Sequence, residues 1–168
     1  MIPVDRVNVW DADDAYRRFL HCCGANRWAQ AMVAARPFGD ETALLAAAGR
    51  QFAVLTRTDW LEAFAAHPRI GDLDSLRLKF QDTAHLAAAE QASVRGTTEA
   101  IIQALARGNV AYERKFGYIF IVCATGKTAA QMLALLEARL TNEPDLELEL
   151  AAAEQRQITR LRLEKIAL

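Results

Sequence analysis

Apolar residues recur at every third or fourth position along most of this chain, which is the spacing of one face of an α-helix. Alanine and leucine dominate, and only four prolines and eight glycines occur among 168 residues. Helix-breaking residues are therefore scarce, and no repeat, linker or change of composition marks a domain boundary. We predict an all-α fold with a single domain over residues 1–168, a compact bundle of about seven to nine helices.

Capping residues mark where the helices are expected to begin. Four helices are expected in the N-terminal part, each beginning at or after one of these residues: Asp11 or Asp13, Asn26, Asp40 and Thr58. The first ends at Gly24 and the fourth runs into His67, which is therefore expected to lie against the core. Four more helices are expected over about 82–95, 97–115, 128–140 and 144–168, with a break at Gly96 and a candidate interruption at Gly108.

One stretch departs from the helical pattern, the apolar run over residues 118–124. Its β-branched and aromatic residues favour an extended backbone. A single strand cannot form a sheet alone, so this segment either pairs with another strand or lies buried. In a buried segment the backbone polar groups need other partners, a ligand among them.

Charge and cysteine content exclude several functions. The formal net charge is -1, from 20 basic and 21 acidic residues, so neither nucleic acid nor a membrane surface is an expected partner. No apolar run is long enough to span a membrane, and no signal peptide is evident. Cys22 and Cys23 are adjacent and Cys123 lies in an apolar run, which indicates reduced thiols in the cytoplasm. No spacing typical of metal ligands occurs.

Three places could carry chemistry, and each has a plain structural explanation. His67 precedes Pro68 at the end of a predicted helix, where it is either a simple terminator or a side chain held rigidly toward a pocket. Glu90 and Gln91 stand among small residues, so they either face a pocket or belong to a solvated surface. Arg162 lies between two leucines; it is either exposed or a carboxylate anchor, because its guanidinium can make paired hydrogen bonds.

Together these residues belong to a series of motifs that resembles the 2-oxo-4-hydroxy-4-carboxy-5-ureidoimidazoline (OHCU) decarboxylase family, whose members catalyse the last step from urate to allantoin. The resemblance covers essentially the whole chain. The motifs that carry it are Arg36-Pro37-Phe38, His67-Pro68-Arg69-Ile70-Gly71, Glu90-Gln91, Tyr112-Glu113-Arg114-Lys115-Phe116-Gly117, Phe120-Ile121-Val122-Cys123-Ala124, Arg139-Leu140-Thr141-Asn142 and Leu161-Arg162-Leu163.

The resemblance implies an all-helical fold in which the extended segment lines the active site. It also implies the site residues: His67 and Glu90 as catalytic residues, and Pro68, Gln91, Phe120, Ile121, Val122 and Arg162 as substrate-binding residues. Arg162 is expected to anchor the substrate's anionic group, and Glu90 to fix the ureido group and tune His67. One departure concerns Ala87, because the family often has serine there, and a polar contact to the substrate is then absent or made by water.

The expected activity is that of a carboxy-lyase that needs no cofactor and makes (S)-allantoin. In the family's substrate a ring C=N bond next to the carboxylated carbon can accept the electrons that departing CO2 leaves behind, so neither a metal nor an organic cofactor is expected. The resemblance also favours a homodimer. The chain's end at Leu168 lacks a peroxisomal address, which favours the cytoplasm.

Two other functions remain open. One is an all-helical interaction or adaptor domain without enzymatic activity, for which alanine-rich helices are equally suitable. The other is a lyase that depends on a cofactor. The enzyme interpretation predicts that His67, Glu90 and Arg162 converge on one concave site.

Overall fold

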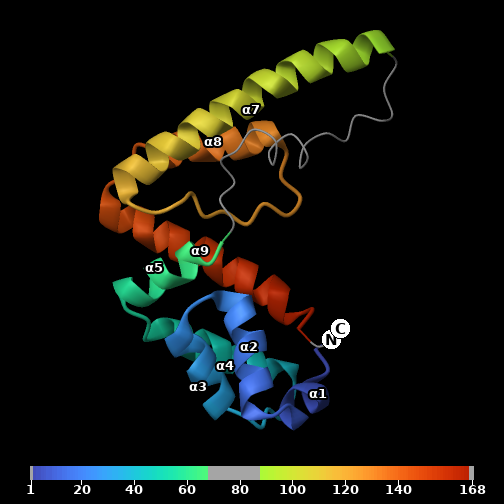
Figure 1. Cartoon of the computed structure of the whole chain (residues 1–168), viewed down its shortest axis with the longest axis vertical. Helices are drawn as coiled ribbons and strands as arrows, with labels where there is room; N and C mark the ends of the chain where they lie inside the picture. Colours follow the sequence, from blue (N-terminus) through green and yellow to red (C-terminus); the bar gives the residue numbers. More distant parts are fainter. Residues whose placement is uncertain (1, 68–87, 167–168) are drawn as a thin grey trace. The chain divides into compact units, whose positions relative to one another are not determined.

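The computed structural model describes residues 2–67 and 88–166, and over 88–97 it describes the backbone alone. Within these ranges the chain forms helices and no strand, which confirms the all-α prediction (Figure 1). The helices are α1 (Val4–Val9), α2 (Ala12–Cys23), α3 (Asn26–Ala34), α4 (Glu41–Ala53), α5 (Arg57–Ala65), α7 (Ala88–Phe116), α8 (Ala129–Arg139) and α9 (Pro144–Leu163). Residues 118–124 leave the helical pattern, as the sequence indicated, and they form no strand, so the alternative of pairing with another strand is not found. The helix start expected near residue 82 lies outside the described residues.

Side-chain caps mark the starts of α2, α4, α5 and α8. Asp11 accepts a hydrogen bond from the Asp14 N–H at 2.7 Å at the start of α2, and Asp40 does the same for Ala43 in α4. The expected cap at Thr58 is wrong. Helix α5 begins two residues earlier, where Thr56 and Asp59 cap each other's backbone N–H groups in a capping box. Each cap satisfies N–H groups that the first turn leaves without a helical partner.

The break expected at Gly96 is also wrong, because α7 is continuous over 29 residues. A single glycine costs a helix interior only about 1 kcal/mol, which is too little to end a helix by itself. Gly108 does not interrupt α7 either. A Cβ atom there would lie 2.6 Å from Cδ2 of Leu136, so this glycine lets α7 approach α8 closely. The two helices pack side by side (Figure 1).

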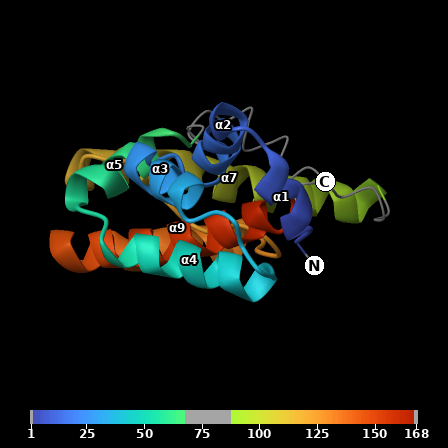
Figure 2. The ribbon, with the colours of Figure 1, turned by 90° about the horizontal axis from the view of Figure 1, so that it is seen from below.

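The chain divides into two compact units, each described here by itself. The first comprises Met1–His67, Ile121–Cys123 and Leu150–Leu168, and the second Pro68–Phe120 and Ala124–Glu149. In the first unit α3 packs against α2, α4 and α5 (Figure 2). Its core holds a run of neighbouring aromatic rings: Phe19, Trp28, Phe52, Trp60 and Phe64. No observation tests the expected single domain, which stays a prediction.

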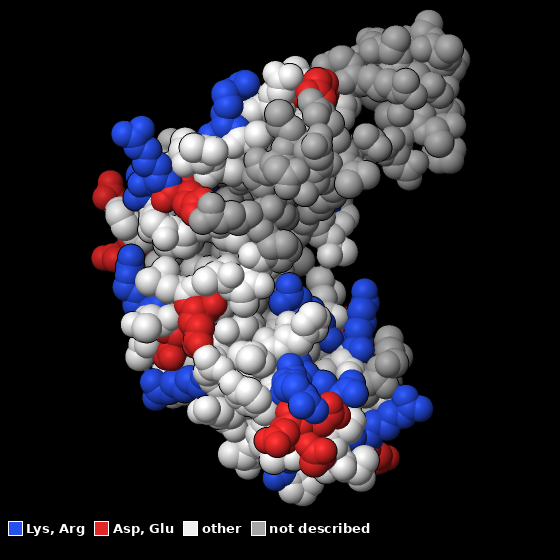
Figure 3. Space-filling view, viewed as in Figure 1, with Lys and Arg blue, Asp and Glu red and all other residues white. Residues whose placement is uncertain are grey.

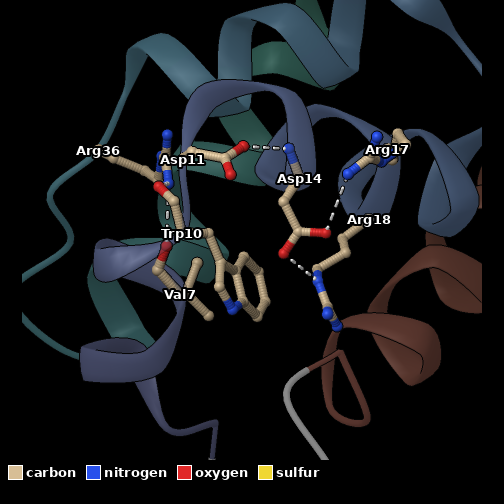
Figure 4. A network of polar contacts seen from close by, with 7 residues as sticks. All are labelled: Val7, Trp10, Asp11, Asp14, Arg17, Arg18 and Arg36. Carbon is tan, nitrogen blue, oxygen red and sulfur yellow. Dashed lines mark hydrogen bonds and ion pairs between the residues drawn. The ribbon is translucent and has the colours of Figure 1, made fainter.

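Helix α1, which the sequence analysis did not anticipate, is attached through the Arg36-Pro37-Phe38 motif. Arg36 donates from Nη1 to the carbonyls of Val7 at 3.1 Å and Trp10 at 2.7 Å, at the end of α1 (Figure 4). The Asn8 side chain exchanges two hydrogen bonds of 2.8 Å with the backbone of Phe38. This motif therefore has a structural role, which explains its place in the series.

The surface charge agrees with the balanced composition. Lys and Arg side chains are interspersed with Asp and Glu on the face that Figure 3 shows. In the described part of the chain, no helix has both the length and the apolar character needed to cross a bilayer.

Candidate active site

His67 stands at the end of α5, where three helices of the first unit meet. The inner face of α5 is buried and consists of Trp60, Ala63 and Phe64. The His67 N–H donates to the Phe64 carbonyl at 3.2 Å, so the last turn continues to His67. The imidazole follows directly and is half-buried. The side chain therefore projects from the rigid end of a packed helix, which confirms that His67 lies against the core.

Gly24 brings the end of α2 to the end of α5. Its φ of 90° is left-handed, a conformation that glycine adopts without the steric cost of a side chain. A Cβ atom at this position would lie 2.6 Å from the Cβ of Ala66 and 3.0 Å from the carbonyl oxygen of Ala63. A side chain at residue 24 would clash at this contact, so glycine lets the end of α2 lie directly against the end of α5, next to His67.

Side chains of α9 donate hydrogen bonds to the backbone carbonyls at the C-terminal end of α2. A helix leaves its last carbonyls without N–H partners, and in α2 these belong to His21, Cys22 and Cys23. Arg162 Nη1 donates to the first two at 3.1 Å and 3.2 Å, and Gln155 Nε2 donates to the third at 3.2 Å. The positive guanidinium also suits the negative end of the helix dipole. Arg162 and Gln155 are thereby held beside His67.

Gln155 connects α9 to His67 directly. Its Oε1 lies 2.6 Å from Nε2 of His67, and its Nε2 also donates to Oγ1 of Thr159 at 3.2 Å. Burial lowers the pKa of His67 below its usual 6.5, and the nearby Arg162 guanidinium lowers it further, while the hydrogen bond to Gln155 acts in the opposite direction. Burial and the guanidinium therefore favour the neutral form of the imidazole.

Arg162 is half-exposed, and only its Nη1 group is used in capping α2. Nε and Nη2 make no hydrogen bond to any residue that the structure describes, so one edge of the guanidinium can receive a ligand. A fixed cation beside a neutral imidazole can bind a carboxylate and exchange a proton with the same molecule. The structure thus brings two predicted site residues together, His67 and Arg162.

The segment over residues 118–124 is buried, and part of its backbone pairs with a side chain. Ile121 and Val122 are buried in the first unit, and the Cys123 N–H donates to the Glu154 carboxylate at 2.6 Å. Phe120 belongs to the second unit, where its ring packs against Tyr112 and lies 4.8 Å from the guanidinium of Arg139. Helix α9 therefore supplies one of the partners that the backbone of this segment requires.

Three motif residues of the second unit surround the buried carboxylate of Glu147 in a polar cluster, which we call the Glu147 cluster: Tyr112, Arg139, Asn142 and Glu147. Glu147 is fully buried and accepts hydrogen bonds from the Tyr112 hydroxyl, from Arg139 Nε at 2.7 Å and from Asn142 Nδ2 at 2.7 Å. The cluster joins the end of α7, the end of α8 and the start of α9. These motif residues therefore hold the second unit together, beneath the ring of Phe120.

The other predicted site residues are not located. Pro68 and Ala87 lie outside the described residues, and so do the side chains of Glu90 and Gln91, whose backbone belongs to α7. The roles assigned to all site residues stay predictions. None of the three cysteines is in a disulfide, and burial raises the pKa of Cys22 to about 12 and that of Cys23 to about 11. Across the described residues, no His, Cys, Asp and Glu side chains group as a metal site would require.

Sequence reasoning missed Gln155 and Thr159, both fully buried polar residues. A signal for them exists in the helical spacing of α9. Ala152, Gln155, Thr159 and Leu163 follow one another at intervals of three or four residues and are all buried, so they share one inner face. Two hydrogen-bonding side chains on such a face need partners, which predicts a buried polar contact.

Comparisons with known proteins agree with the resemblance noted in the sequence. The chain is 44% identical over 146 residues to the uric acid degradation bifunctional protein TTL of Arabidopsis thaliana, covering 86% of this chain and 45% of that protein. It is 38% identical over 60 residues to 2-oxo-4-hydroxy-4-carboxy-5-ureidoimidazoline decarboxylase of Amia calva, covering 36% and 34% of the two chains. The chain thus matches less than half the length of either relative.

Solved structures share the fold. A crystal structure of OHCU decarboxylase in the presence of (S)-allantoin has a TM-score of 0.70 and 37% identity, covering 93% of this chain and 97% of that one. A crystal structure of (S)-allantoin synthase has a TM-score of 0.68 and 19% identity, covering 97% and 53%, and shows the fold alone. The family model for OHCU decarboxylase matches residues 8–164. This match across nearly the whole chain shows that it belongs to the OHCU decarboxylase family.

Proposed function

We propose that this chain is a carboxy-lyase that converts OHCU to (S)-allantoin in urate degradation. The observation that carries the proposal is the match to the OHCU decarboxylase family over residues 8–164. The pairing of a neutral His67 with Arg162 in the first unit supports it, because an anionic substrate that must exchange a proton needs groups of these two kinds.

The chemistry requires little from the protein beyond binding and proton handling. The C–C bond to the carboxylate breaks, CO2 leaves, and the electron pair enters the ring C=N bond of the substrate. A proton then has to reach one face of the ring, which sets the configuration of allantoin. The protein contributes by fixing the carboxylate out of the plane of the C=N bond, excluding water and placing the proton.

The described residues fit these tasks. Arg162 is locked onto the end of α2, so its open edge can orient the substrate's carboxylate with little loss of side-chain entropy. His67 is neutral and rigidly mounted, so it can accept and return a proton. Glu90 and Gln91 are proposed to contribute as in the family, with Glu90 fixing the ureido group. Pro68, Phe120, Ile121 and Val122 are proposed to line the substrate.

The compartment and the assembly follow the sequence-based expectations. We propose a cytoplasmic homodimer that acts on this small molecule without a cofactor.

The experiment that tests the function uses freshly made substrate, produced from urate by the two upstream enzyme activities. Circular dichroism then follows the appearance of optically active allantoin. The expected result is faster formation of (S)-allantoin than the spontaneous decay, which gives a racemate. A rate and optical purity equal to those without the protein would refute the proposed function. Metal analysis and an absorbance spectrum of the purified protein test the absence of a cofactor.

A further inference from the structure

The amide of Gln155 has one possible orientation. Its Nε2 group faces two acceptors, the Cys23 carbonyl and the Thr159 Oγ1, each at 3.2 Å. A carbonyl oxygen can only accept, so the nitrogen of the amide must lie on that side. Oε1 consequently faces Nε2 of His67 at 2.6 Å. Gln155 is fully buried, so its amide depends on these protein partners for its hydrogen bonds.

This orientation determines which nitrogen of His67 carries the proton. An amide oxygen accepts and does not donate, so the contact with Gln155 requires a hydrogen on Nε2. In a neutral imidazole only one ring nitrogen is protonated, which leaves a lone pair on Nδ1. Nδ1 makes no hydrogen bond to any of the described residues, whereas Nε2 is hydrogen-bonded to Gln155 on α9.

We propose that Gln155 is a positioning residue that keeps the proton of His67 on Nε2, so that Nδ1 is the atom that exchanges a proton with the substrate. The inference rests on the proposed decarboxylase function. After CO2 leaves, Nδ1 accepts the proton of the substrate's hydroxyl group as its C=O bond forms, and returns it to the neighbouring ring carbon. The ring nitrogen that received the electron pair takes one proton from water, so each turnover consumes one proton.

The first test needs no variant. Long-range ¹H–¹⁵N correlation spectra of the ¹⁵N-labelled protein at pH 7 distinguish the two neutral forms of a histidine ring, and the spectrum of His67→Asn identifies the signals of residue 67. We expect a proton on Nε2 and none on Nδ1. Adding (S)-allantoin should shift the Nδ1 signal and leave the Nε2 proton in place. A proton on Nδ1, or an allantoin effect that is absent or confined to Nε2, would overturn the proposal.

The second test uses Gln155→Met, which keeps the length of the side chain but removes both the amide oxygen that faces His67 and the amide nitrogen that donates to the Cys23 carbonyl. We expect kcat to fall at least about tenfold with KM nearly unchanged, because Gln155 acts through His67 rather than on the substrate. In the NMR spectrum of this variant, the proton of the neutral His67 ring should no longer be confined to Nε2. Gln157→Met is the matched control, because Gln157 is exposed on the same helix and should leave both constants unchanged.

The outcomes separate this inference from the proposed function. If the unaltered protein fails to accelerate allantoin formation, the function is wrong, whatever the state of His67. If it is active but Gln155→Met retains kcat, or loses kcat only in proportion to unfolded protein seen by circular dichroism, then Gln155 has a purely structural role.

Discussion

Glu147 offers a sharp test of what holds the second unit together. Its carboxylate is fully buried and accepts hydrogen bonds from Tyr112, Arg139 and Asn142, all of which act as donors. Glu147→Gln keeps the size of the side chain but removes the charge and turns an N–H₂ group toward a donor. Arg139, itself buried, then loses its ion pair with the Glu147 carboxylate. Breaking a buried ion pair from one side costs about 3–5 kcal/mol.

We therefore expect urea denaturation to show a free energy of unfolding lower by about 3–5 kcal/mol. Thermal unfolding should show a fall in Tm of about 6–20 °C for a chain of this size. Glu137→Gln is the control, because Glu137 is exposed on α8 and its change should cost less than about 0.5 kcal/mol.

A double variant distinguishes the ion pair from simple packing. Arg139→Met combined with Glu147→Met removes both charges, and it should be more stable than Glu147→Gln because no buried guanidinium then lacks the Glu147 carboxylate. A loss below about 1 kcal/mol in Glu147→Gln, or a double variant less stable than that single one, would refute this account of the Glu147 cluster.

Four further predictions concern the first unit. His67→Asn should lower kcat at least about 100-fold with the fold intact by circular dichroism, and a smaller loss argues against a proton-transfer role. Arg162→Lys should raise KM about tenfold through loss of the forked geometry, while unchanged steady-state constants would limit Arg162 to capping α2. Gly24→Ala should lower the free energy of unfolding by at least about 1–2 kcal/mol, because the new Cβ clashes with Ala66. It should also lower kcat, because the clash shifts His67. A fully stable and active variant would contradict that packing. The pKa of His67 is below 6.5 in the folded protein, so the unfolded chain binds more protons as the pH falls below 6.5. The free energy of unfolding should therefore decrease toward lower pH, and it should decrease less in His67→Asn. An equal dependence of the free energy of unfolding on pH in both proteins, measured by urea denaturation, would contradict this.

The positions of most helix ends followed from short sequence patterns. Asp11, Asp40 and Thr128 each cap a backbone N–H group three residues ahead, a contact that depends only on neighbours. The irregular segment over residues 118–124 was likewise visible in its β-branched composition. The errors at Gly108 and α1 arose where tertiary contacts decided the outcome, whereas the glycine at residue 96 is too weak a signal to end a helix. Gly96 and Gly108 lie inside one continuous helix, and α1 is held by Arg36 and Asn8.

The candidate site divides in the same way. His67 and Arg162 could be selected from the sequence because a motif series resembled a family, and the local stop at Pro68 explained why a histidine stands at a helix end. Nothing local indicated that Gln155 connects them. Its hydrogen bond to the Cys23 carbonyl joins residues 132 positions apart, and such contacts depend on how whole helices pack.

By itself, the sequence determined that this protein is helical, where most of its helices begin and end, and which family it belongs to, because these properties rest on neighbouring residues and motif order. Only the tertiary structure decided that α2, α5 and α9 meet at Gly24. There, side chains of α9 donate hydrogen bonds to the last carbonyls of α2, and one of the same side chains contacts His67. The physical reason is that an unpaired buried polar group is costly, so the chain satisfies it with whatever partner packing brings near.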